Sequence, residues 1–384
     1  MRTVDEILQR ISPLVVGQDP FDVERIWQDL FALTYTSVRG IPALVPQRRQ
    51  LVTAMSAIDI AAVGHYGEGG RPAALFPLRR LRQRVPVYVT GFYYKDGERE
   101  DDLKREAALY MGQGYRTVKV KVGGLTPEAD AVRVGLIRKA VGNDVVIMLD
   151  ANQGWNLSTA VRAARLCEPY NIFWLEDPMP WYDERHTLRR LKEAVSIPIA
   201  AGETEYSPFG IRTLVAEGLV DYLIIDSTWA GGLTTWRKAA AVAELYQVPM
   251  AAHHDPQIHV HAVAASPTGF ILESFADPAR DPLWFELFRE RPRLVQEVAR
   301  QFEFKSLQQA VDDVCDYRLR LGPFVASAFT LLPFVGFVPA GNPNGFRLIA
   351  LPGRVGARGR AVAGGRAAKD EIFSVRRDSV PFRL

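Results

Sequence analysis

The chain has 384 residues, of which 48% are hydrophobic and 24% charged, so it can form a large core and does not have the composition of a disordered protein. The chain has 47 basic and 44 acidic residues. Residues 345–384 contain nine of the basic and three of the acidic ones, so the rest of the chain has 38 basic and 41 acidic residues. Because that remainder is mildly acidic, the formal charge of +3 does not indicate a nucleic-acid partner.

The two cysteines, Cys167 and Cys315, form no CxxC pair, which argues against a disulfide framework and a cysteine zinc site and favours a reducing compartment. The segment Met1–Arg10 is charged and lacks the apolar core of a signal peptide. We therefore expect a cytoplasmic location.

The first sixty residues predict helices. Apolar side chains recur at helical spacing in residues 22–31 and again in residues 48–62. From residue 63 to 84 the chain is rich in Gly, Arg, Pro and Ala and has no sustained periodicity, which predicts a loop or an atypical segment.

From Val85 onward, short apolar runs alternate with helical patterns. The predicted strands cover residues 85–90, 117–122, 145–149, 172–175, 197–200, 222–225, 248–252 and 270–272. The predicted helices between them cover residues 127–141, 158–167, 184–195, 209–217 and 234–246. Eight β/α units in about 190 residues predict an α/β fold of the (β/α)8 TIM-barrel type over residues 85–290.

After residue 290 the pattern weakens. Residues 292–313 have helical character, whereas residues 322–341 contain no charged side chain and are long enough to span a bilayer. Pro323, Pro333 and Pro339 interrupt that stretch, so a transmembrane helix is only the weaker alternative. Residues 353–368 are rich in Gly, Arg and Ala, and we expect them to be disordered.

The chemistry is predicted at the ends of the strands. Lys119 and Lys121 lie two residues apart in a strand and so share a face, which for an isolated pair is a solvated surface. Downstream, Asp150, Glu176 and Glu203 each follow an apolar run. One carboxylate alone would be read as a cap, turn or loop residue. Three from consecutive strands predict a Mg²⁺ site at the C-terminal end of a barrel.

Asp226 and His253 end the next two strands, where a carboxylate–imidazole contact would make a general base. A capping aspartate and a satisfied loop histidine are the alternatives. Strand alternation allows only one of His253 and His254 to point inward. His259 and His261 are assigned to the following helix with structural roles. Glu273 ends the eighth strand, where burial near other acids would keep it protonated.

Together these motifs resemble the mandelate racemase subgroup of the enolase superfamily. The resemblance covers about residues 20–61 and 85–290, and the spacing from Asp226 to His253 and from there to Glu273 favours His253 over His254. The matching motifs are Lys119-Val-Lys121, Leu-Asp150-Ala-Asn152, Leu-Glu176-Asp-Pro, Gly-Glu203, Asp226-Ser-Thr-Trp-Ala-Gly-Gly and Val-Pro-Met-Ala-Ala-His253.

The resemblance implies a Mg²⁺-dependent abstraction of the proton α to a carboxylate, through an enediolate. It implies that Asp150, Glu176 and Glu203 hold the metal, with Asn152 orienting ligands. Lys121 would be one base, its pKa lowered by Lys119 and the nearby cation, and Lys119 would face the substrate carboxylate.

The resemblance implies that the His253–Asp226 pair, on the opposite side of the substrate, is the second base or the general acid. It also implies that Glu273 forms a hydrogen bond with the substrate carboxylate. Protonation at a β-hydroxyl would dehydrate an acid sugar to a 2-keto-3-deoxy acid, which we favour. Reprotonation at the α-carbon would make a racemase or epimerase. The partner is then a small-molecule carboxylate, with homo-oligomerisation expected as well.

The chain also departs from this family. Residues 1–84 resemble only the later helices of its capping domain, residues 62–84 do not match it, and the tail of residues 291–384 lacks the short strands that return to the cap. Because closure of the cap excludes water in such enzymes, a truncated or degenerate non-catalytic paralogue is a further alternative.

Overall fold

A computed structural model describes residues 2–66, 81–82, 84–182 and 184–286 and four short later strands. The predictions for residues 67–80, for the disorder of residues 353–368 and for most of residues 322–341 concern residues outside the described part. The N-terminal elements are α1 (Arg2–Val15), η1 (Pro20–Asp22), α2 (Val23–Ala32), η2 (Val45–Gln47) and α3 (Arg48–Tyr66). Helix α3 therefore extends four residues beyond the predicted end at residue 62.

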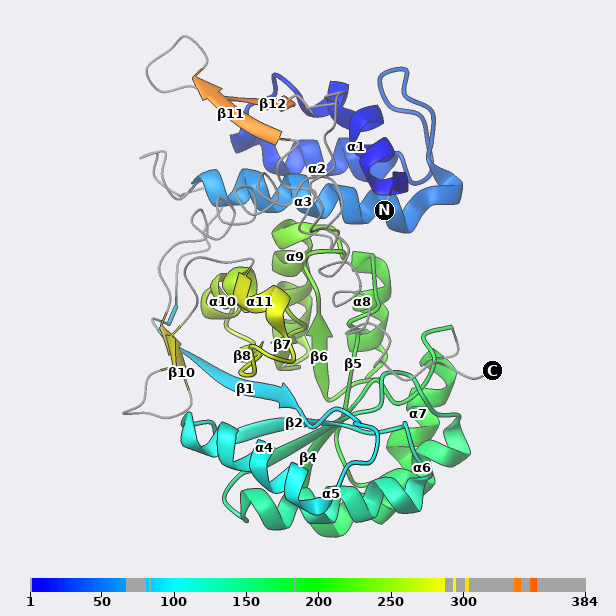
Figure 1. The fold of residues 1–384 in the computed structure, drawn as a ribbon. Helices are drawn as coiled ribbons and strands as arrows, with labels where there is room; N and C mark the ends of the chain where they lie inside the picture. Colours follow the sequence, from blue (N-terminus) through cyan, green and yellow to red (C-terminus); the bar gives the residue numbers. More distant parts are fainter. Residues whose placement is uncertain are drawn as a thin grey trace. The chain divides into compact units, whose positions relative to one another are not determined.

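Eight parallel strands follow, at the positions that the sequence predicts (Figure 1). They are β1 (Val85–Gly91), β2 (Thr117–Lys121), β3 (Val146–Asp150), β4 (Ile172–Glu176), β5 (Ile199–Ala201), β6 (Tyr222–Ile225), β7 (Met250–Ala252) and β8 (Gly269–Ser274). The strands pair in the order β2-β3-β4-β5-β6-β7-β8-β1, and β1 pairs again with β2. The α/β barrel predicted from the alternating pattern is confirmed.

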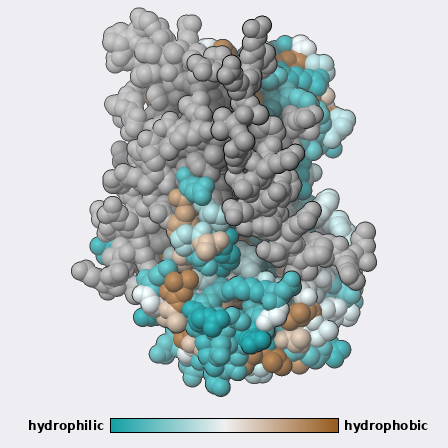
Figure 2. Space-filling model, in the orientation of Figure 1, coloured by the Kyte–Doolittle hydropathy of each residue, from teal (hydrophilic) through white to brown (hydrophobic). Residues whose placement is uncertain are grey.

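Helices connect the strands, as expected for parallel pairing. They are α4 (Glu100–Gly112), α5 (Pro127–Val141), α6 (Leu157–Cys167), α7 (Glu184–Ala194), α8 (Pro208–Ala216), α9 (Gly232–Leu245) and α10 (Pro256–Ala265), with η3 (Glu168–Tyr170) after α6 and α11 (Pro282–Glu286) after β8. Over α4 and α5 the surface is mostly hydrophilic (Figure 2), as expected for helices that cover a barrel from outside.

The predictions for the tail need correction where residues are described. In the segment predicted as helical, β9 (Arg293–Leu294) and β10 (Gln301–Glu303) pair with each other, and β10 pairs with β1. Within the apolar stretch 322–341, β11 (Val335–Pro339) pairs with β12 (Phe346–Ala350), which contacts α1 and η1. The tail thus contains short strands that return to the N-terminal helices. Backbone pairing with a partner distant in sequence overrides local helical periodicity here.

No helix in the described part of the chain is long and apolar enough to cross a membrane. The chain divides into two compact units. One contains the residues up to Val87, Ala201–Ser274 and the described residues from 283 on, and the other contains Tyr88–Ala200 and Phe275–Pro282. We refer to them as the first and second unit, and describe each by itself.

In the first unit, α2 and α3 hold the turn that precedes α9. The Trp27 indole donates to the Gly231 carbonyl (2.8 Å), and the Ser56 hydroxyl accepts from the Gly231 amide (2.8 Å). One carboxylate oxygen of Asp59 accepts from the Thr234 amide (2.9 Å). Gly232 has a φ of +84°, and a Cβ there would lie 2.2 Å from Asp59. Glycine is therefore required, and the turn that follows Asp226 is fixed by the N-terminal helices.

Asp59 predicts a measurable pH dependence of stability. Burial raises its pKa from 3.8 to about 7, although hydrogen bonds from Thr234 oppose the shift. Between these values the folded state keeps a proton that the unfolded state has lost, so stability should fall as the pH rises from about 4 to 7, by at most about 1.4 kcal/mol per pH unit. Asp59→Asn should remove this dependence, as tested by urea unfolding at pH 5 and pH 7.5. An identical pH dependence in both proteins would show that Asp59 is charged throughout.

Candidate active site

In the second unit, three predicted site residues lie side by side. The strand register pairs Lys121 of β2 with Asp150 of β3, and Asp150 with Glu176 of β4. Each is the last residue of its strand. Because the strands are parallel, the three side chains emerge at the same, C-terminal, edge, where barrel enzymes have their active sites.

Both lysines reach these carboxylates. The Lys121 ammonium lies 2.5 Å from Asp150 Oδ2, and the Lys119 ammonium lies 3.4 Å from the same atom and 2.6 Å from Glu176 Oε1. Asp150, Glu176 and Lys119 are fully buried. The Trp174 indole donates to the other oxygen of Glu176 (3.0 Å). The two carboxylates thus converge on one cation, which in this structure is the ammonium of Lys119.

Asp150 is held as an anion. Burial raises its pKa, but the ammonium groups of Lys121 and Lys119 outweigh that effect, so the pKa lies below its ordinary value. The amide of Asn152 donates to Asp150 Oδ1 (3.0 Å), and Asn152 has a φ of +44°. It is therefore the backbone of Asn152 that orients this carboxylate, in the turn directly after β3.

In the first unit, the predicted His253–Asp226 contact is present. Asp226 Oδ2 lies 2.9 Å from Nδ1 of His253, and Oδ1 accepts from the amide and hydroxyl of Thr228. On the other side of the ring, Nε2 lies 3.3 Å from Glu203 Oε2. Burial opposes protonation, but Glu203 and Asp226, followed by Glu273, raise the pKa of His253 to about 9. The Asp226 carboxylate thus both shapes its turn and pairs with the imidazole.

His254 does not point away from His253 as strand alternation predicted. Strand β7 ends at Ala252, and His254 has a φ of +54°, so strand geometry no longer applies to it. Its ring stacks on the His253 ring at 3.7 Å between centroids. Asp226, His253 and His254 offer ligand atoms within 4.8 Å of one another, a candidate metal group among the described residues. His259 lies on α10 as expected, where Nε2 accepts from the Ser227 amide (2.9 Å) and Nδ1 bonds the His254 carbonyl (3.0 Å).

Glu273 lies in β8, and one of its oxygens accepts from the backbone amide of His254 (2.7 Å). It therefore fixes the turn that carries both histidines. Asp255 was not identified from the sequence. It is a buried carboxyl whose pKa is raised well above its ordinary value by burial and by the neighbouring Asp226 and Glu273. Its φ of +47° extends the same irregular turn.

Trp229, which was not predicted as a site residue either, connects two predicted site residues, His253 and Glu203. Its indole ring stacks on the His253 ring (5.5 Å between centroids, 21° between planes), and its Nε1 donates to the Glu203 carbonyl (2.7 Å). The motif Asp226-Ser-Thr-Trp contains this residue, but no local periodicity indicates that its ring would cover a histidine 24 positions later.

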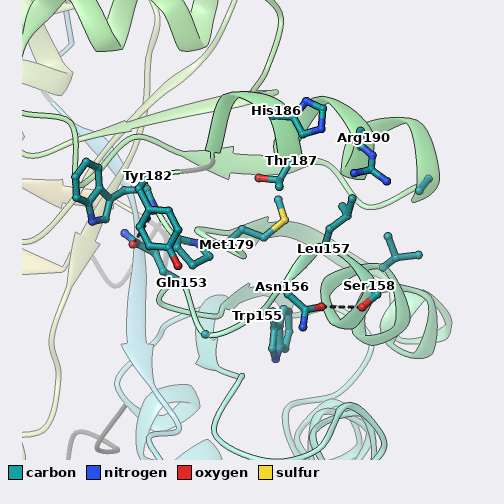
Figure 3. Close-up of a pocket in the computed structure, with 15 residues that line it drawn as sticks. Gln153, Trp155, Asn156, Leu157, Ser158, Met179, Tyr182, His186, Thr187 and Arg190 are labelled. Atoms are coloured by element: carbon teal, nitrogen blue, oxygen red, sulfur yellow. Dashed lines mark hydrogen bonds between the residues drawn. The ribbon is translucent and has the colours of Figure 1, made fainter. Parts of the chain in front are cut away.

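A cavity of ≈ 1210 Å³ lies beside the turns after β3 and β4 (Figure 3). Trp155, Asn156, Met179, Tyr182 and Arg190 are among the residues that line it. Gln153 at its edge accepts from the Trp181 amide (3.1 Å) and donates its own amide to the Asp177 carbonyl (2.6 Å). The cavity therefore borders loops that begin directly after Asp150 and Glu176.

The fold is an α/β barrel, and buried lysine–carboxylate and histidine–carboxylate groups lie where its parallel strands end. It therefore belongs to a class of enzyme folds whose active sites lie at that end. Residues 102–300 match the family model described as "Enolase C-terminal domain-like". The chain belongs to this family, as the motifs of the sequence indicated.

Individual relatives are similar to the chain over most of its length. An arabinonate dehydratase of Saccharolobus solfataricus is 28% identical over 69% of this chain and 70% of its own length. A 3,6-anhydro-alpha-L-galactonate cycloisomerase of Streptomyces coelicolor is 31% identical over 68% and 69%. A solved L-talarate dehydratase from Polaromonas sp. JS666, complexed with Mg and L-glucarate, is 28% identical over 78% and 79%, with a TM-score of 0.66. The relatives thus include dehydratases and cycloisomerases of acid sugars.

The raised pKa of His253 yields a direct test. Asp226→Asn removes one of the anions that stabilise the imidazolium, so in metal-free protein the pKa of His253 should fall from about 9 by at least roughly one unit. NMR titration of the imidazole Cε1 proton would measure it. Asp221→Asn, just before the same strand, removes an equal charge as the control. An unchanged value in Asp226→Asn would show that the ion pair does not control the imidazole.

Proposed function

We propose that this chain catalyses the Mg²⁺-dependent removal of the proton α to the carboxylate of an acid sugar, followed by dehydration to a 2-keto-3-deoxy acid. The observation that carries the proposal is the row of Lys121, Asp150 and Glu176 across three paired strands. Two fully buried carboxylates beside a half-buried lysine at strand ends are costly for a purely structural role, since desolvation opposes them.

The metal ligands in this proposal are Asp150, Glu176 and Glu203. The donor set fits: three carboxylate oxygens suit Mg²⁺, which keeps its other positions for water and substrate. Asp150 and Glu176 already converge on a cationic group, at 3.4 Å and 2.6 Å from the Lys119 nitrogen. Glu203 follows β5, which is next to β4 in the strand order. The bound ion would supply a Lewis acid that stabilises charge developing on the substrate carboxylate.

Lys121 is proposed as the base. In its neutral form, the side-chain nitrogen would take the α-proton, and the electron pair of the C–H bond would pass to the substrate carboxylate to form an enediolate. Lys119, whose ammonium contacts the carboxylates of Asp150 and Glu176, would donate to that carboxylate and help to keep Lys121 neutral through like-charge repulsion.

His253 is proposed as the acid. It faces Asp226, which favours the imidazolium and fixes the ring by its contact at Nδ1 (2.9 Å). Nε2 would give its proton to the β-hydroxyl of the substrate, which leaves as water while the enediolate electrons form the new double bond. The resulting enol then tautomerises to the 2-keto acid. Glu273, which accepts a hydrogen bond from the His254 amide, would also form a hydrogen bond with the substrate carboxylate.

The alternative outcome is protonation of carbon by His253, which would make the chain a racemase or epimerase. The names of the relatives favour a dehydratase or a cycloisomerase, since arabinonate dehydratase and an anhydrogalactonate cycloisomerase are among them. A degenerate paralogue without turnover is the remaining alternative.

Turnover is tested by proton NMR of acid sugars in D₂O with purified protein and Mg²⁺. We expect loss or exchange of the α-proton, with rates about 10²–10⁴-fold lower for Lys121→Ala and for His253→Asn. The product spectrum distinguishes dehydration, cycloisomerisation and racemisation. Absence of exchange for every acid, with a folded protein that binds Mg²⁺, would favour the degenerate paralogue.

Metal binding is tested apart from turnover. Mg²⁺ should raise the melting temperature of the protein, because a ligand that binds only the folded state stabilises it. Asp150→Asn and Glu176→Gln should each abolish most of this rise, whereas Glu205→Gln, a carboxylate outside the proposed set, should retain it. An equal rise in all four proteins would show that the ion binds elsewhere.

A further inference from the structure

Arg49 is an exposed arginine in the first unit that lies over Trp229, the residue whose ring stacks on His253. It lies in the first turn of α3, and this turn contains no acidic residue. Its guanidinium carbon is 5.9 Å from the centre of the Trp229 ring. That distance is within the range of a cation–π contact. Among the described residues no carboxylate pairs with it. By contrast, Arg25 on α2 pairs with Asp22 and Asp29.

Trp229 connects this arginine to His253. The indole ring stacks on the imidazole at 5.5 Å, and its Nε1 bonds the Glu203 carbonyl. The Trp229 amide and that of Ala230 both donate to the Asp226 carbonyl (3.4 and 3.0 Å). The indole is therefore held in place from several directions, and it sets the separation between the guanidinium and the imidazole.

We propose that Arg49 binds a second carboxylate, at the far end of the substrate, so that the enzyme prefers dicarboxylic acid sugars to their monocarboxylic counterparts. The proposal rests on the proposed function and names its substrate class. A guanidinium forms bidentate, charge-assisted hydrogen bonds with a carboxylate, which makes arginine suited to this recognition. One solved relative holds L-glucarate, which is a dicarboxylic acid sugar.

The dimensions are compatible with a six-carbon diacid. The Arg49 guanidinium carbon lies 5.9 Å from the centre of the Trp229 ring, which lies 5.5 Å from the centre of the His253 ring. These two distances limit how far the guanidinium lies from the imidazole. In an extended chain, four C–C bonds separate the α-carbon from the distal carboxylate by about 5 Å. Contacts of about 3 Å at either end complete the span. A distal hydroxymethyl group, as in a monocarboxylic acid, would leave the guanidinium without an anion.

The test compares glucarate and galactarate with gluconate and galactonate in steady-state kinetics with Mg²⁺. For the wild type we expect a higher kcat/KM on a diacid than on its monoacid. Arg49→Met should lower the diacid value about 10–100-fold, mostly through KM, and change the monoacid value less than about 3-fold. The diacid kcat/KM of Arg49→Lys should lie between those of the wild type and Arg49→Met. Arg25→Met removes one charge from the same N-terminal helices and should leave both values unchanged.

Calorimetry with the His253→Asn protein measures binding without turnover. Tighter binding of the diacid that disappears in the Arg49→Met/His253→Asn double variant supports the inference even if the reaction type proves different. Turnover of monoacids alone, or an equal loss on both substrate types in Arg49→Met, overturns the inference and leaves the proposed function standing. If no acid is turned over or bound by any variant, both proposals fail.

Discussion

The burial of opposite charges where β2, β3 and β4 end is the constraint on which the candidate site depends. Lys119, Asp150 and Glu176 are fully buried, and an unpaired charge at such a position would cost several kcal/mol. Each is tolerated because the strand register brings an opposite charge within 2.6–3.4 Å. The same pairing prepares the carboxylates for a divalent ion, since a set of anions that attracts an ammonium also attracts a metal.

The histidine side of the site depends on backbone turns. His253, His254 and Asp255 lie after the end of β7, where the chain enters the left-handed region for two residues. Such a conformation is unfavourable for residues other than glycine and persists only when the surroundings hold it. Here the Glu273 carboxylate bonds the His254 amide, and His259 bonds its carbonyl. Residues that are not themselves reacting groups thus determine where the imidazole of His253 points.

The difference between these two sides explains what the sequence could predict. Lys119, Lys121, Asp150 and Glu176 lie in three neighbouring strands, so alternation and strand ends were sufficient to bring them together. The stacking of His254 on His253 could not be predicted, because it depends on a turn that breaks the alternation. Trp229 and Arg49 were missed for a related reason, since their contacts join residues far apart in sequence. In the tail, the pairing of β10 with β1 replaced a helix predicted from local pattern alone.

Helix α3 holds the turn that precedes α9, and it also carries the arginine proposed to bind the substrate. Ser56 and Asp59 on its inner side hold the turn from Gly231 to Thr234, and through it the segment that contains Asp226. Arg49, two turns earlier, lies over Trp229 from the same segment. A change in the position of this helix would therefore alter the His253–Asp226 pair and the proposed carboxylate contact together.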